Sequence, residues 1–283
     1  MSMPKSDRRR SWRGHLLLLH PGPSAVCTLV TAISGWSAWR QRPAEEIPAG
    51  SWTARLAAAC AAMAFAQMST GVLNDAFDAP WDRIHQRYKP IAAGAVPRHR
   101  AWLIGVACGF ASLALASRAG SRALRLMLLG LASGWGYSLG LSRTPISFLP
   151  FASGLATVPL LGPAAVDVRL SAQGQVAVLA AGLGVGLHLA NSGPDIERDR
   201  LAGRRSLPVL LGEGGSRRAG HGLLAAGALT AAVSVPRAGR GWAWTGSGVA
   251  AALVLADWLA PTSVRGRGEH PFVIPTLAGG AVA

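Results

Sequence analysis

The stretch ISFLPFASGLATVPLLGPAAV, residues 146–166, contains no Asp, Glu, Lys or Arg. A helix of about 20 apolar residues crosses the hydrocarbon core of a bilayer, so this stretch is long enough to span it. Residues 14–39 and 170–194 are also free of these charges. Six shorter charge-free runs follow the same pattern: 56–74, 101–117, 126–142, 219–236, 241–256 and 271–283. The sequence therefore predicts an all-α, polytopic membrane protein with nine transmembrane helices.

The overall composition agrees with this prediction. Only 14% of the residues are charged, where soluble domains average about a quarter, and half are hydrophobic. The 35 glycines favour close packing between transmembrane helices. No linker is long enough to divide the chain, so residues 1–283 are predicted to form a single transmembrane domain.

The net charge of +15 would suggest nucleic-acid binding in a soluble protein, but here the distribution of the basic residues indicates membrane topology. With nine spans and a cytosolic N-terminus, 19 of the 28 Lys and Arg residues fall in cytosolic segments. This bias predicts a multi-pass protein of the cell membrane with residues 1–13 as a cytosolic basic tail, and no nucleic-acid partner.

Six of the 13 acidic residues lie in two short clusters that share the pattern Asn-x₃-Asp-x₃-Asp. The pattern comprises Asn74, Asp78 and Asp82 in the first cluster, and Asn191, Asp195 and Asp199 in the second. A spacing of four places successive side chains on one face of a helix. Two such faces, opposed across a bundle, would gather carboxylate and amide oxygens at its cytosolic end.

Clustered carboxylates repel one another unless a cation lies among them. An oxygen-only set without His or Cys favours a hard ion, so Mg²⁺ is predicted rather than Zn²⁺. Mg²⁺ keeps positions open for phosphate oxygens, which accounts for the basic residues beside both clusters. These are Arg83, Arg87 and Lys89 after the first, and Arg198, Arg200, Arg204 and Arg205 around the second.

The two clusters resemble the signature motifs of the UbiA superfamily of intramembrane prenyltransferases. The first motif is NDAFDAPWDRIHQRYKPIAAG, residues 74–94, and the second is DIERDRLAGRRSLPVLLG, residues 195–212. A weaker third match is Tyr137-Ser138 with Arg143. The resemblance implies a bundle of about nine helices around a cavity open to lipid, in which Mg²⁺ binds an isoprenyl diphosphate. The implied reaction transfers the isoprenyl group to an aromatic or other small acceptor.

The resemblance also implies roles for individual residues. The metal ligands would be Asn74, Asp78, Asp82, Asp195 and Asp199, assisted by Asn191. Asp75 matches the motif but leaves the face of Asn74 by about 100°, and is ranked lower. The diphosphate would be neutralised by Arg87, Lys89 and Arg143, with Tyr137 and Ser138 as hydrogen-bond donors. Asp78, Asp195, Arg87 and Lys89 are the predicted catalytic residues.

Two polar residues lie deeper in the predicted bundle. Gln67 precedes Asn74 by seven residues and His188 precedes Asp195 by seven, which is two helical turns in each case. Each therefore faces the same side as its motif and is a candidate for substrate binding. A hydrogen bond between neighbouring helices is the alternative role for both.

Two other functions fit parts of the pattern. A membrane terpene cyclase would ionise the same prenyl diphosphate, and its cation would then close on its own chain. A transporter would place half-helix ends near the middle of the membrane, whereas these acids cluster at one face.

Overall fold

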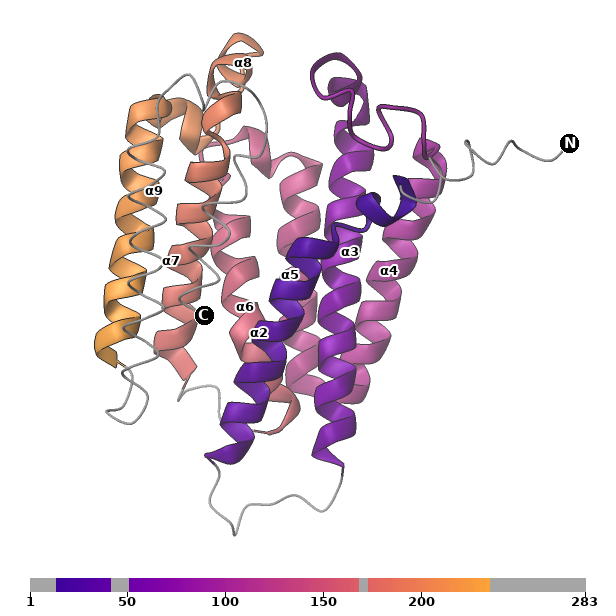
Figure 1. Cartoon of the computed structure of the whole chain (residues 1–283), viewed down its shortest axis with the longest axis vertical. Coiled ribbons are helices and arrows are strands. Elements are labelled where there is room, and N and C mark those ends of the chain that lie inside the picture. Colours follow the sequence, from indigo (N-terminus) through magenta and orange to yellow (C-terminus); the bar gives the residue numbers. More distant parts are fainter. Residues whose placement is uncertain (1–13, 42–50, 168–172, 235–283) are drawn as a thin grey trace, which may run out of the picture. The chain divides into compact units, whose positions relative to one another are not determined.

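The computed structural model describes residues 14–41, 51–167 and 173–234, and every regular element among them is a helix (Figure 1). These residues fall into two compact units. The first contains α2 (Pro21–Arg40), α3 (Trp52–His85), α4 (Arg98–Ala119), α5 (Ser121–Leu139) and the part of α6 (Leu149–Ala165) that begins at Thr157. The second contains η2 (Leu141–Arg143), the start of α6, α7 (Gly174–Asn191), η4 (Gly193–Asp195), α8 (Ile196–Leu201) and α9 (Leu207–Ser234).

The all-helical prediction is confirmed for these residues. Helices α3, α4 and α7 are long and apolar enough to cross a membrane, and α6 is an apolar helix of 17 residues. Helices α2, α5 and α9 cover most of the predicted spans 14–39, 126–142 and 219–236. The predicted spans 241–256 and 271–283 lie outside the described residues.

The predicted span 14–39 is interrupted, which is the first difference from expectation. Residues 14–18 form a short helix, and α2 begins only at Pro21. His20 between them has φ 49° and ψ 59°, the left-handed conformation that ends a helix. Pro21 then starts the next helix, because a proline at its first position loses no intrahelical hydrogen bond.

The second difference concerns the predicted span 56–74, because its helix extends beyond the apolar run and includes the first acidic motif. Helix α3 continues through the first acidic motif to His85. Ala76 and Ala79 alternate with the acids and are fully buried in a small core with Leu18, Val72 and Ile91. This packing extends the helix beyond the apolar run that was read from the sequence.

Two glycines allow α2 to approach α6 within the first unit. A Cβ atom on Gly162 would lie 2.6 Å from the backbone nitrogen of Gly35. The Thr31 hydroxyl on α2 also donates a hydrogen bond of 3.2 Å to the Val158 carbonyl on α6. Backbone contact of this kind leaves no space for a side chain, so the two positions require glycine.

We therefore predict that Gly162→Ala destabilises the protein by about 1–3 kcal/mol, because the added methyl group must push two backbones apart. Thermal unfolding of the purified protein in detergent measures the effect. Gly182→Ala on α7 is the matched control, since nothing lies within 4 Å of a Cβ atom at that position. Equal unfolding temperatures for the two variants would contradict the packing described here.

Candidate functional site

The first acidic motif lies on the last three turns of α3, and its polar side chains form two sets. Asn74 donates a hydrogen bond from Nδ2 to Asp78 Oδ2 at 3.4 Å, which is the pairing that the spacing of four predicted. Asp75 and Asp82 are seven residues apart, two turns of the helix. Both carboxylates are almost fully buried, with exposed fractions of 4% and 2%.

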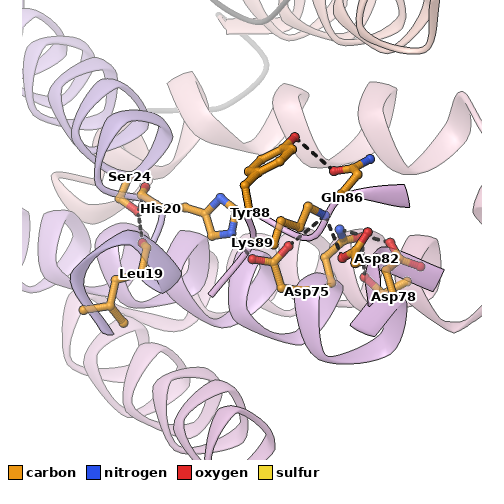
Figure 2. A network of polar contacts seen from close by, with 11 residues as sticks. Leu19, His20, Ser24, Asp75, Asp78, Asp82, Gln86, Tyr88 and Lys89 are labelled. Atoms are coloured by element: carbon orange, nitrogen blue, oxygen red, sulfur yellow. Dashed lines mark hydrogen bonds and ion pairs between the residues drawn. The ribbon is translucent and has the colours of Figure 1, made fainter. Parts of the chain in front are cut away.

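Lys89 joins the two buried carboxylates (Figure 2). Its Nζ lies 3.1 Å from Asp75 Oδ1 and 3.0 Å from Asp82 Oδ2. The segment after α3 folds back so that the lysine reaches these acids, with Lys89 N donating to the Gln86 carbonyl at 3.1 Å. Burial alone would lower the pKa of the Lys89 ammonium, but the two carboxylates outweigh this and raise it. Lys89 therefore remains charged between them.

His20 completes this cluster from outside the motif. Its Nε2 lies 3.0 Å from the second oxygen of Asp75, so this carboxylate contacts a basic side chain on both sides (Figure 2). The ring packs against Gly71, where a Cβ atom would lie 2.8 Å from His20 Cγ. Sequence reasoning missed His20 because its contact depends on the chain break before α2, which no periodicity indicates. The lower rank of Asp75 as a metal ligand stays a prediction, and the sequence did not indicate the contact of Asp75 with Lys89.

Of the remaining candidates in the first unit, some lie beside the acidic motif and others contact different residues. Ser138 at the end of α5 donates a hydrogen bond to Asn74 Oδ1 at 3.3 Å, which brings the predicted donor to the motif. Tyr137 is half-buried beside it. Gln67 instead donates to the sulfur of Met63 at 3.6 Å. Arg87 is exposed and donates to the Arg83 carbonyl at 3.1 Å, so it caps the end of α3 rather than contacting the acids.

The second motif lies in the second unit and is not one continuous helix, contrary to the expected helical face. Asn191 is the last residue of α7, Asp195 ends η4, and Asp199 lies on α8. The break falls at Gly193 and Pro194. Proline disfavours the helical conformation of the residue before it and offers no N–H, so α7 ends and a new turn begins.

Each acid of the second motif has a basic partner. Asp195 pairs with Arg198, and Asp199 Oδ1 lies 3.1 Å from Arg204 Nη1. Burial raises the pKa of Asp199, and the neighbouring guanidinium groups of Arg204, Arg198 and Arg143 only partly offset this. The Arg143 carbonyl on η2 accepts a hydrogen bond from Arg205 N at 3.1 Å, which ties η2 to this motif.

His188 is buried two turns before the second motif. Its Nε2 lies 3.0 Å from the Ser147 hydroxyl, and its ring stacks on Phe151 at a centroid distance of 4.7 Å. Ser147 also accepts a hydrogen bond from Leu207 N at 3.1 Å. His188 thus holds the start of α9 and the segment before α6 to α7, which is the structural alternative considered for it. Asn191 Oδ1 is buried and has no hydrogen-bond partner among the described residues.

Within the part of the chain that the structure describes, no three His, Cys, Asp or Glu side chains converge as metal ligands. The two motifs belong to separate units. A single magnesium site formed by both therefore stays a prediction.

The model of the UbiA prenyltransferase family matches residues 24–268, which include both motifs. The chain belongs to this family. Together with the long apolar helices, membership identifies a multi-pass membrane protein.

The relatives agree with this assignment. Digeranylgeranylglyceryl phosphate synthase from Pyrococcus abyssi is 31% identical over 142 residues, and its namesake from Pyrococcus horikoshii is 30% identical. In each case the chain spans about half the length of the curated relative, 51%.

Two solved structures share the fold over nearly the whole chain. The apo UbiA homolog from Aeropyrum pernix K1 has a TM-score of 0.69 at 21% identity, covering 92% of this chain and 96% of that one. The UbiA homolog from Archaeoglobus fulgidus bound to GPP and Mg²⁺ has a TM-score of 0.68 at 21% identity, covering 95% of both chains.

We predict that Lys89→Met destabilises the protein by about 3 kcal/mol, because it leaves two buried carboxylates without the ammonium between them. Unfolding by heat or denaturant in detergent measures the loss. Arg87→Met is the control, since it removes an exposed cation from the same segment. If both variants unfold alike, Lys89 does not stabilise the buried acids.

Proposed function

We propose that this protein transfers an isoprenyl group from a prenyl diphosphate to a small acceptor within the membrane, in a Mg²⁺-dependent reaction. The observation that carries the proposal is the set of acids buried at the end of an apolar helix. Burying two carboxylates is costly, and the fold retains both Asp75 and Asp82 at 4% and 2% exposure. Ionisable residues that a membrane protein keeps buried in this way mark functional sites.

The donor atoms suit Mg²⁺. Asn74, Asp78 and Asp82 offer only oxygen ligands, and the second motif adds Asp195 and Asp199. These five residues would hold the ion, with Asn191 Oδ1 as a further oxygen that has no hydrogen-bond partner among the described residues. When bound, Mg²⁺ supplies positive charge to the diphosphate and so makes it a better leaving group.

The basic residues beside both motifs serve the same purpose. Departure of the leaving group breaks the bond between the allylic carbon and the diphosphate oxygen, and negative charge grows on that oxygen. Lys89 in the first unit and Arg143 in the second are each placed beside their own motif, where a cation stabilises this charge. Ser138 stands against Asn74 and adds a neutral hydroxyl.

The carbon side of the reaction needs dry surroundings. An allylic carbocation is captured by water, so the prenyl chain must react in an apolar pocket. Apolar helices such as α3 and α7 supply that environment in a membrane. The cation then bonds to the acceptor, which loses a proton.

The experiment that tests the proposal asks whether an acceptor receives the prenyl group. Purified protein is incubated with Mg²⁺, prenyl diphosphates of several chain lengths, and a panel of aromatic acceptors. An isoprenylated glyceryl phosphate belongs in the panel because the curated relatives carry the name digeranylgeranylglyceryl phosphate synthase. An acceptor-bound prenyl product supports the proposal. A cyclic product formed without any acceptor would support the terpene cyclase instead, and no product under any condition would reject both.

Asp78→Ala and Asp195→Ala should each abolish turnover while the protein stays folded, because each removes a ligand that the diphosphate complex requires. Turnover at saturating Mg²⁺ and the unfolding temperature are measured together. Glu197→Ala is the control: this acid lies beside Asp195 but is 69% exposed and pairs with Arg200. Near-normal turnover in either aspartate variant rules out the two-motif site.

We further propose that the N-terminus is cytosolic and that both motifs face the cytosol. In a variant without native cysteines, Tyr88→Cys, at an exposed position after α3, should react with a membrane-impermeant maleimide only from the cytosolic side. Gln41→Cys, at the exposed C-terminal end of α2, should react only from the outer side of the membrane. Labelling with the two sides exchanged would overturn the topology.

A further inference from the structure

The first motif contains a proline in the middle of α3. Pro80 lies between Asp78 and Asp82, and the helix continues through it to His85. A proline has no N–H, so the carbonyl four residues earlier loses its helical hydrogen bond. That carbonyl belongs to Ala76, a fully buried residue that directly follows Asp75. A buried carbonyl without a donor is unfavourable, so the motif requires one from elsewhere.

Arg98 provides this donor. Its Nε donates a hydrogen bond to the Ala76 carbonyl at 2.7 Å, from the first residue of α4. The contact joins residues 22 positions apart and occupies the carbonyl that Pro80 leaves free. A charged donor makes a stronger hydrogen bond than a backbone amide, so Arg98 fully replaces the N–H that the proline lacks.

The position of Arg98 has no explanation in α4 itself. The N-terminal end of a helix carries partial positive charge, and a cation there is unfavourable. The first turn of α4 nevertheless holds Arg98 and Arg100, with no acidic residue. Charge at the cytosolic face accounts for both arginines equally, but of these two described residues only Arg98 donates a side-chain hydrogen bond to α3.

We propose that Arg98 is a positioning residue for the acidic motif. By replacing the hydrogen bond that Pro80 removes, it fixes the turn of α3 that carries Asp75, Asp78 and Asp82 in one orientation. Neither Arg98 nor Pro80 belongs to the set of residues that would hold the metal or the diphosphate. The inference rests on the proposed function, since it assumes that these acids hold Mg²⁺ and a prenyl diphosphate.

A double-mutant cycle on the full-length protein tests the pairing of Arg98 with Pro80. Its members are the wild type, Arg98→Ala, Pro80→Ala and the double variant. Pro80→Ala restores an N–H for the Ala76 carbonyl, and alanine is a strong helix former, so α3 remains helical. Arg100→Ala is the matched control, because it removes the same charge from the same helical turn.

Three quantities are measured for each protein in detergent: the affinity for Mg²⁺ alone by calorimetry, turnover of the prenyl diphosphate, and the unfolding temperature. Arg98→Ala should weaken Mg²⁺ binding about tenfold, as expected when a buried carbonyl loses its donor. In the Pro80→Ala background the same change should cost less than about threefold, because the new amide serves the carbonyl. Arg100→Ala should leave Mg²⁺ binding unchanged.

The outcomes separate the two proposals. Equal losses in both backgrounds, or a lower unfolding temperature with unchanged Mg²⁺ affinity, would show that Arg98 does not position the acids. The expected coupling in Mg²⁺ binding without turnover of any donor would overturn the proposed function and leave the positioning role intact. A wild type that binds no Mg²⁺ overturns both.

Discussion

The contact of Lys89 with Asp75 and Asp82 is the interaction on which the arrangement of the first unit depends. Two carboxylates on an apolar helix repel each other and lose the hydration that they have in water. A cation must therefore reach them, and Lys89 does so only if the chain reverses after His85. The requirement for charge balance thus favours a path of residues 86–97 that brings Lys89 back to the acids. His20 adds a second polar partner to Asp75 from the start of α2.

The same principle holds in the second unit. Asp195 and Asp199 pair with Arg198 and Arg204, which lie within five residues of them. Both units therefore place acids and bases side by side rather than acids alone. A ligand that contains a cation and an anion, such as a magnesium diphosphate, matches this pattern, because its ion can contact the carboxylates while its phosphates contact the basic side chains.

The sequence predicted the parts of this site that depend on local geometry. The spacing of four identified Asn74 and Asp78 as neighbours on one face, and in the structure Asn74 Nδ2 lies 3.4 Å from Asp78 Oδ2. The proximity of Lys89 to the acids was also predicted, since both lie within one motif. The contact of Lys89 with both Asp75 and Asp82 was not predicted, because it depends on the direction from which the lysine returns. His20 lies 55 residues from its partner, and no sequence period connects the two.

The two motifs differ in backbone at the point where each contains a proline. Pro80 frees a carbonyl that accepts a hydrogen bond of 2.7 Å from Arg98, and α3 continues with its acids on one helix. Pro194 follows a glycine, and there the chain leaves α7, forms η4 and starts α8 at Ile196. Both motifs have the same Asn-x₃-Asp-x₃-Asp spacing, although Pro80 lies in the second interval of its motif and Pro194 in the first interval of the other. The donor for the carbonyl that Pro80 frees is a tertiary contact with Arg98, which the sequence does not indicate. The equal spacing therefore predicted a common chemistry for the motifs, but not a common backbone.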